Sequence, residues 1–241
     1  MLKELSRWSA VLVAALVSSP ALAQSQADFV TAFSGKWQVY DKGMAAGATP
    51  CQLDLSNLGT DGKLGVVADG CKAPLAAAHS WAIEGSQLVL YDEQAAAVVK
   101  LGGNQKRITG TAGDGLPVIL ERLGGDGTAG LLLAAVNASH CYYLGYTQKC
   151  AAKNEAMSVP AEGPQSQVKL LVNLNAHSEP RNDADTVGTV KLGTCVAVQR
   201  CVTASDGPWC RVTLGANTGW LRKLTIRQNR WPVVTFANSC G

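Results

Sequence analysis

The stretch that decides the fold runs from Gly35-Lys36-Trp37, through Cys51-Gln52-Leu53-Asp54-Leu55, to Ile119-Leu120-Glu121-Arg122. Apolar and polar residues alternate in its middle part, so odd positions are expected to face inward and even positions outward. Breaks rich in glycine, asparagine and aspartate separate further segments of the same kind, and such short, turn-punctuated strands favour a β-barrel or a sandwich. The expected strands cover residues 36–41, 51–55, 64–68, 87–92, 97–101, 106–111 and 116–122.

Two tryptophans and two cysteines stand among these strands in the order Trp37, Cys51, Cys71, Trp81. This order resembles the alkaline-proteinase inhibitor family, small periplasmic inhibitors of bacterial zinc metalloproteases that also include an outer-membrane lipoprotein branch. The resemblance covers residues 24–124. It implies an eight-stranded antiparallel, lipocalin-like barrel and a disulfide between Cys51 and Cys71. We expect both tryptophans in the barrel core rather than around a ligand pocket.

The family inhibits by inserting a flexible N-terminal strand into the protease cleft, with its terminal amine directed at the catalytic zinc. A neutral amine is a suitable zinc ligand, and an extended strand adds main-chain hydrogen bonds. The resemblance therefore implies an inhibitory segment, although a frayed terminus is the alternative and cyclisation of a terminal glutamine would remove the amine. The segment would comprise Gln24, Ser25, Gln26, Ala27, Asp28 and Phe29.

The first 23 residues have the pattern of a signal peptide. Lys3 and Arg7 precede an apolar run at 10–17, and Ala21-Leu22-Ala23 is a small-x-small cleavage site. We therefore expect a mature chain that begins at Gln24 and is periplasmic or secreted. No cysteine follows the cleavage site and no later apolar run reaches about 18 residues, so neither a lipid anchor nor a membrane span is expected.

The eight cysteines form an even set, which in an oxidising compartment indicates disulfides rather than metal ligands. No Cys-x-x-Cys pair and no paired-histidine motif occurs, so no metal site is expected. Apart from the pair that the family implies, six cysteines allow 15 connectivities. A hairpin turn at 205–208 would place Cys201 opposite Cys210. We expect that pair, the local pair Cys141–Cys150 and, by elimination, Cys195–Cys240.

Residues 166–241 are again rich in expected strands, at 168–174, 187–190, 195–203, 209–214 and 219–221. The spacing of Leu174-Asn175, Gly207-Pro208-Trp209 and Gly219-Trp220-Leu221 resembles the bacterial SH3 domain over residues 166–227. The resemblance implies an SH3-like small barrel and a groove formed by His177, Trp209 and Trp220 that takes peptidoglycan or a peptide. His177 departs from the arginine often found at that position. Residues 125–165 are interpreted as a linker with a disulfide-stapled loop or a short helical turn.

The charge distribution supports the interpretation that the chain has two domains. Residues 24–124 carry 8 basic and 10 acidic side chains, whereas residues 166–241 carry 9 basic and 4 acidic ones. The basic excess suits an anionic surface such as a cell wall but is too small to indicate nucleic acid.

No catalytic motif or cofactor-binding loop is found, so we expect a non-enzymatic protein without a cofactor. The leading hypothesis is an exported, inhibitor-like binding protein directed at a metalloprotease. The alternative is a non-inhibitory envelope adaptor that binds peptidoglycan or a protein partner through the SH3-like domain.

Overall fold

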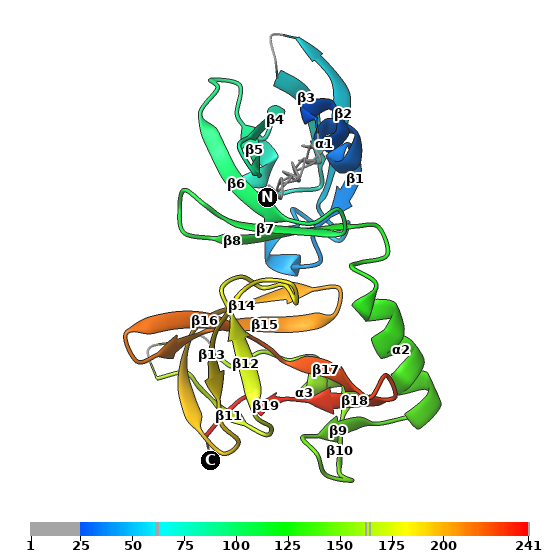
Figure 1. Cartoon of the computed structure of the whole chain (residues 1–241), viewed down its shortest axis with the longest axis vertical. Coiled ribbons are helices and arrows are strands. Elements are labelled where there is room, and N and C mark those ends of the chain that lie inside the picture. Colours follow the sequence, from blue (N-terminus) through cyan, green and yellow to red (C-terminus); the bar gives the residue numbers. More distant parts are fainter. Residues whose placement is uncertain (1–24, 61–62, 162, 164, 241) are drawn as a thin grey trace, which may run out of the picture.

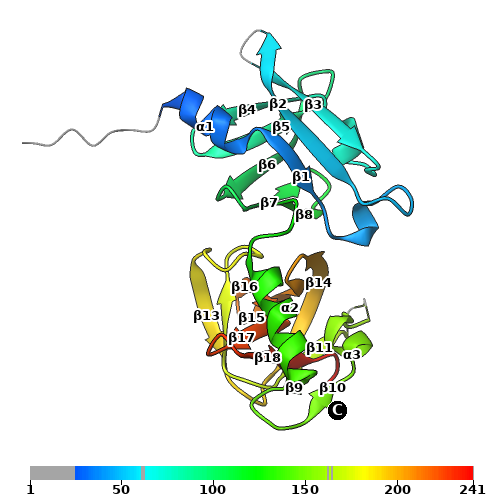
Figure 2. The ribbon, with the colours of Figure 1, turned by 90° about the vertical axis from the view of Figure 1, so that its right-hand side faces the viewer.

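The computed structural model describes residues 25–60, 63–161, 163 and 165–240. The expected signal peptide and Gln24 lie outside the described residues. The chain forms two parts that stack along the long axis of the molecule, with α2 beside the second part (Figures 1 and 2). No helix in the described ranges is long and apolar enough to cross a membrane.

The first part is a closed barrel in which each strand pairs with the next one along the chain. The barrel closes where β1 pairs antiparallel with β8, with Trp37 opposite Arg122 and Gln38 opposite Glu121. All other neighbours are antiparallel, so the predicted eight-stranded antiparallel barrel is confirmed. Its strands are β1 Gly35–Gln38, β2 Gln52–Thr60, β3 Lys63–Asp69, β4 Ser80–Glu84, β5 Gln87–Tyr91, β6 Ala97–Gly103, β7 Arg107–Ala112 and β8 Pro117–Arg122.

Alternation along the strands fills the barrel with apolar side chains. Cys51, Leu53 and Leu55 are at most 1% exposed, as their odd positions predict. Both tryptophans lie in this core and both are 0% exposed. The Trp81 indole donates to the carbonyl of Ser56 at 2.9 Å, where β2 leaves its regular register with β3. The buried indole nitrogen is thus satisfied by a carbonyl that the strand ladder does not use.

Three helical segments accompany the barrel: α1 Gln26–Phe33 precedes it, and the short 3-10 helices Lys42–Met44 and Leu75–Ala77 lie in its connections. α2 Thr128–Ser139 then leads into the second part. The predicted linker at 125–165 is therefore structured. It holds α2, β9 Tyr142–Leu144, β10 Cys150–Ala151 and α3 Lys153–Met157.

The second part contains two sheets. The larger has seven strands in the order β13-β12-β16-β15-β14-β11-β19, and the smaller has the order β10-β9-β18-β17. β9 lies parallel to β18, so a segment expected to be a linker shares a sheet with the C-terminal strands. The strands are β11 Gln167–Leu170, β12 Leu174–His177, β13 Thr186–Val190, β14 Cys195–Ala204, β15 Gly207–Leu214, β16 Asn217–Arg222, β17 Leu224–Arg227, β18 Trp231–Val234 and β19 Phe236–Ala237.

Four disulfides join elements within these parts: Cys51–Cys71, Cys141–Cys150, Cys195–Cys240 and Cys201–Cys210. These are the four pairs named from the sequence. Cys201 and Cys210 lie directly opposite each other on β14 and β15. Together with the barrel and the sheets, these bonds confirm the all-β, disulfide-stapled fold class. They are also consistent with secretion, because disulfides persist in oxidising compartments.

Candidate functional site

The N-terminal helix α1 lies against one end of the barrel. Arg122 at the end of β8 donates to the carbonyl of Ala32 at 2.6 Å and to that of Ser34 at 2.8 Å. The same guanidinium lies over the Trp37 ring, 4.2 Å from its centroid. The indole nitrogen of Trp37 in turn donates to the carbonyl of Phe33 at 2.8 Å. The C-terminal turn of α1 is therefore fixed to the barrel by two side chains.

The N-terminal half of α1 is held less firmly. Gln26, Ala27 and Asp28 are exposed, and no side chain of the helix is fully buried. A capping box starts the helix: the Ser25 side chain accepts from the Asp28 amide at 3.2 Å, and the Asp28 carboxylate accepts from the Ser25 amide at 3.0 Å. The hydroxyl and the amide of Ser25 lower the pKa of Asp28. The side-chain hydrogen bonds that start this first turn are therefore local.

The expected inhibitory segment therefore has a conformation that the sequence interpretation did not foresee. We expected a flexible strand, whereas residues 26–33 form a helix in the unbound chain. Cavities lie on both sides of it, about 650 Å³ against the β6–β7 turn and about 450 Å³ against β2, β3 and β4. The pattern Ser25-x-x-Asp28 is a readable sequence signal for this helix start.

The residues of the expected SH3-like groove lie close together but offer little open surface. Trp209 is 0% exposed, and its indole donates to Asp206 at 3.0 Å. The His177 ring packs edge-on against Trp209 at 6.0 Å between centroids and is within 3.0 Å of the Ala184 carbonyl. Trp220 is 7% exposed and borders a cleft of about 360 Å³ between the second part and the β7–β8 turn. In this structure Trp209 has no surface that a ligand could reach.

The barrel covers that groove through the outer face of β7 and β8. Ile108 and Leu120 point into the barrel core, so their neighbours Arg107, Ile119 and Glu121 point outward, yet all three are at most 4% exposed. Ile119 packs with Trp209, Trp220 and residues of β14. Because β7 and β8 are buried on both faces, their outer face forms the junction between the two parts.

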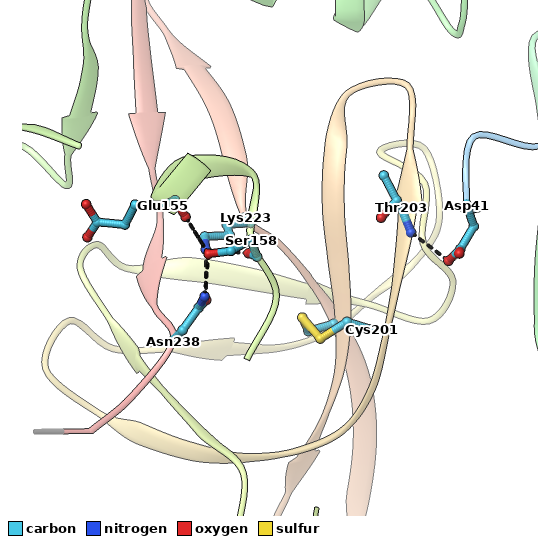
Figure 3. Close-up of a disulfide and its surroundings, with 8 residues drawn as sticks. Asp41, Glu155, Ser158, Cys201, Thr203, Lys223 and Asn238 are labelled. Atoms are coloured by element: carbon cyan, nitrogen blue, oxygen red, sulfur yellow. Dashed lines mark hydrogen bonds between the residues drawn. A yellow bond between two sulfur atoms is a disulfide. The ribbon is translucent and has the colours of Figure 1, made fainter. Parts of the chain in front are cut away.

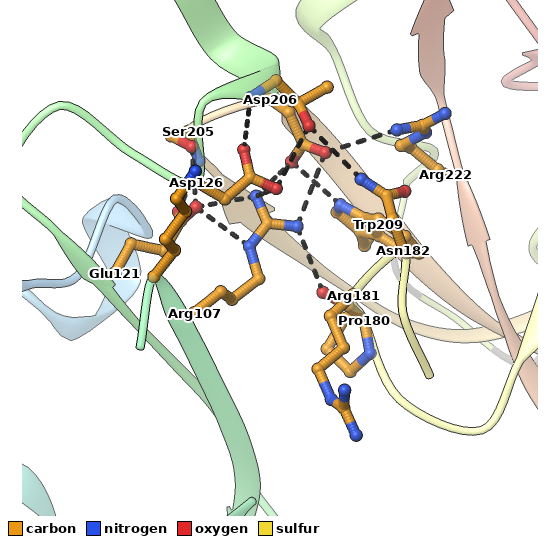
Figure 4. A network of polar contacts seen from close by, with 12 residues as sticks. Arg107, Glu121, Asp126, Pro180, Arg181, Asn182, Ser205, Asp206, Trp209 and Arg222 are labelled. Atoms are coloured by element: carbon orange, nitrogen blue, oxygen red, sulfur yellow. Dashed lines mark hydrogen bonds and ion pairs between the residues drawn. The ribbon is translucent and has the colours of Figure 1, made fainter. Parts of the chain in front are cut away.

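A buried network of charges lies at the centre of this junction (Figure 4). Arg107 donates to Glu121 at 2.9 and 2.7 Å and to Asp206 at 2.7 Å, and it also pairs with Asp126 at 3.2 Å. Arg222 approaches Asp206 from the other side at 3.8 Å. Glu121 belongs to the barrel and Asp206 to the β14–β15 turn, so the guanidinium of Arg107 connects the two parts.

The pKa shifts in this network follow from burial and from the excess of acidic groups. Three carboxylates face two guanidinium groups. Burial raises the pKa of Glu121, although Arg107 and Ser205 act in the opposite direction. For Arg107 burial lowers the pKa, but Asp206 and Glu121 outweigh it and raise the pKa above its ordinary value. Arg107 is therefore charged at neutral pH.

Further hydrogen bonds cross the junction around this centre. The Asp41 carboxylate accepts from the Thr203 amide at 3.0 Å, near the Cys201–Cys210 disulfide (Figure 3). The Asn104 amide donates to Asp183 at 2.8 Å. The sequence analysis identified neither these contacts nor Arg107. No local pattern indicates them, because the partners lie 79 to 162 residues apart in the chain.

The fold and the α1 end together define a disulfide-stapled β-barrel that presents an anchored N-terminal segment. Residues 29–122 match the family described as Protease inhibitor Inh. The match spans every barrel strand and most of α1, and it supports an inhibitor-type barrel and an inhibitor-like function for this part of the chain. A search of curated proteins finds no match. Among the described residues no cluster of three His, Cys, Asp or Glu side chains is arranged to hold a metal ion.

Proposed function

We propose that the chain is an exported inhibitor of a zinc metalloprotease, and that residues 24–29 are the segment that enters the protease cleft. The match of residues 29–122 to the inhibitor family is the observation that carries the proposal. The anchoring of α1 supports it, because Arg122 and Trp37 fix the C-terminal turn of the helix and leave its N-terminal half exposed.

The reach of the segment depends on whether the helix opens. With α1 intact, Gln24 and Ser25 extend about 7 Å beyond it, since an extended residue spans at most about 3.6 Å. With residues 24–29 extended, the reach is about 20 Å by the same measure. Opening the first turn breaks the capping box between Ser25 and Asp28, which costs about 1 kcal/mol. Main-chain hydrogen bonds to the protease would offset this cost.

The terminal amine is the group that would reach the zinc. It needs to be free and unprotonated, and an N-terminal glutamine that cyclises loses it. The cyclised and uncyclised forms of the mature chain differ only at this residue. They therefore make a matched pair in which the barrel, the helix and the second part are the same.

The test is inhibition of a serralysin-type zinc protease by the mature chain beginning at Gln24. We expect inhibition by the chain with a free Gln24 amine, and loss of inhibition in a chain that lacks residues 24–29. The cyclised form is expected to inhibit more weakly than the free form. An unchanged inhibition constant after the deletion would rule out the insertion mechanism. Circular dichroism of the deleted chain checks that the barrel is still folded.

The second candidate function is a cell-envelope adaptor in which the barrel is only a scaffold and the SH3-like region binds peptidoglycan or a protein partner. The basic excess of residues 166–241 favours it. This candidate predicts that the full mature chain sediments with peptidoglycan and inhibits no protease. Because Trp209 is covered by the barrel, binding through the expected groove would require the junction to open. An Arg107→Ala variant that weakens the junction would then bind peptidoglycan more tightly than the wild type.

A further inference from the structure

A second surface, away from the barrel, has the composition of a binding site. Tyr143, Tyr146, Arg227 and Trp231 surround a cavity of about 570 Å³ beside the Cys141–Cys150 disulfide. We call these four residues the aromatic surface. Figure 1 shows its strands, β9 and β18, on the side of the second part that faces away from the barrel. The volume lies within the range of about 300–1,000 Å³ that is typical of ligand sites.

The aromatic surface is built by two segments that are far apart in the chain. Val233 and Val234 of β18 lie opposite Tyr143 and Leu144 of β9 in a parallel pair. The disulfide joins the start of β9 to β10. Two rings of the aromatic surface are in contact, since Tyr143 packs edge-on against Trp231 at 5.5 Å between centroids. A sheet and a covalent bond thus hold the rings in place before any ligand arrives.

The backbone around the aromatic surface includes the end of a helix and a tight turn. Among the described residues, four that are not glycine have a positive φ; of these, His140 lines this cavity, and Gln228 and Asn229 lie between two lining residues, Arg227 and Trp231. Their φ values are 52°, 52° and 54°. Such left-handed conformations are ordinary at the end of a helix and in a tight hairpin turn. Here they end α2 and form the β17–β18 turn between Arg227 and Trp231.

The charge of this surface is entirely positive. Neither residues 127–154 nor residues 207–241 contain an aspartate or a glutamate. Arg227 lies over the Tyr146 ring at 4.3 Å, and Arg230 lies over the Trp231 ring at 4.6 Å. Within the described part of the chain no ion pair involves either guanidinium. A guanidinium that stacks on a ring keeps its N–H edges free, and these edges match a carboxylate or a phosphate.

We propose that the aromatic surface binds an acidic glycan, a chain of pyranose rings that carry carboxylates. The apolar faces of the sugar rings would pack on the faces of Tyr146 and Trp231 that the guanidinium groups leave uncovered, and the carboxylates would accept from Arg227 and Arg230. Tyr146 is 59% exposed and so has area to offer. Four disulfides indicate an oxidising location, which favours a wall or surface polysaccharide over nucleic acid. The proposal deepens the adaptor function, gives it a site other than the expected groove, and is independent of protease inhibition.

The test measures binding of the full mature chain by isothermal titration calorimetry. The probe is a soluble peptidoglycan glycan strand without stem peptides, whose muramic acid units carry free carboxylates. A chitin oligosaccharide of equal length has the same ring backbone without these carboxylates and serves as the neutral control. Polyglutamate and oligothymidylate test whether any polyanion suffices. The variants are Tyr146→Ala and Arg227→Gln, with Arg200→Gln as a control that removes an exposed arginine elsewhere.

We expect the glycan strand to bind at least ten times more tightly than the chitin oligosaccharide. Tyr146→Ala and Arg227→Gln should each weaken binding at least tenfold, whereas Arg200→Gln should weaken it less than twofold. All three variants should inhibit the protease as the wild type does, which separates this test from that of the proposed function. Absence of glycan binding, equal binding of the neutral oligosaccharide, equal binding of polyglutamate or oligothymidylate, or unaltered binding by the two site variants would each overturn the proposal.

Discussion

Replacement of Arg107 by alanine tests the junction most directly. In the folded protein its side chain is 1% exposed and its partners Glu121 and Asp206 are 0% exposed. The substitution removes hydrogen bonds to two buried carboxylates. Each charge-assisted bond is worth about 1.5–3 kcal/mol when one partner is lost. Removal of one partner from a buried ion pair costs about 3–5 kcal/mol.

The remaining contacts set where in this range the result should fall. Glu121 keeps two bonds of 2.7 Å from the amide and the hydroxyl of Ser205. Asp206 keeps its bond from the Trp209 indole at 3.0 Å and a distant contact with Arg222 at 3.8 Å. Neither carboxylate is left wholly without donors. We therefore expect a loss of about 3 kcal/mol in the free energy of unfolding, at the lower end of the range.

The assay is equilibrium unfolding in urea at neutral pH, followed by tryptophan fluorescence. For a chain of this size a loss of about 3 kcal/mol lowers the melting temperature by roughly 6–12 °C. Arg200→Ala removes an exposed arginine and should change stability by less than about 0.5 kcal/mol. Asp206→Asn in the Arg107→Ala background removes one buried negative charge and should restore part of the loss. If Arg107→Ala is no less stable than Arg200→Ala, the reasoning about the junction is refuted.

Two further predictions concern Lys223 and the start of α1. Lys223 is 1% exposed, and its ammonium donates to the carbonyls of Glu155 and Ser158 and to the side-chain oxygen of Asn238 at 2.6–2.9 Å (Figure 3). Burial lowers the pKa of Lys223 to about 8. The unfolded chain then binds this proton more tightly than the folded chain, so wild-type stability should rise by at most about 2 kcal/mol between pH 7.5 and 9.5. In Lys223→Met that rise should be absent in urea titrations at the two pH values, and an equal rise there would contradict the assignment. Asp28→Asn weakens the capping box by about 1 kcal/mol, so the inhibition constant should tighten up to about fivefold if α1 has to open; weaker inhibition would contradict opening.

The sequence predicts the barrel well because its information is local. Alternation at 51–55 assigns a buried face, and the glycine-rich breaks bound most strands within two or three residues. The strand β4 was missed, because Ser80–Glu84 is short and its glutamate and alanine carry little strand preference. It exists because it pairs with β3 and β5, and these are contacts with other segments.

The second part was predicted less completely. The apolar run at 131–136 was too short to indicate a helix, yet α2 spans Thr128–Ser139 and buries only Leu132 and Ala135. Tertiary contact with β17 and β18 stabilises it rather than its own pattern. The strands β17, β18 and β19 were also missed, and the expected strand at 168–174 corresponds to β11, which ends at Leu170, and only reaches the first residue of β12.

In the candidate site, too, contacts between residues close in the chain can be predicted from the sequence, whereas contacts between distant residues cannot. The sequence pattern of Ser25 and Asp28 is that of a capping box. It predicts a helix at this position rather than the expected strand. The charge network could not be predicted, because Arg107 and Asp206 are 99 residues apart and each looks like an ordinary surface residue. One clue was present: Val118, Ile119 and Leu120 are apolar in succession, so one of them had to point out of the barrel. An outward Ile119 requires a covering surface, and the second part provides it.

The junction also determines how the two proposed activities relate. The contact between the parts is buried around Arg107, Ile119 and Trp209, and the hydrogen bonds Thr203–Asp41 and Asn104–Asp183 surround it. Such a contact resists bending, because separation would expose paired charges and a tryptophan together. The helix α1 lies on the barrel, and the strands β9 and β18 of the aromatic surface lie on the side of the second part away from it (Figure 1). A glycan bound at one place would leave the other free. Inhibition by the full chain should therefore be the same in solution and on glycan strands.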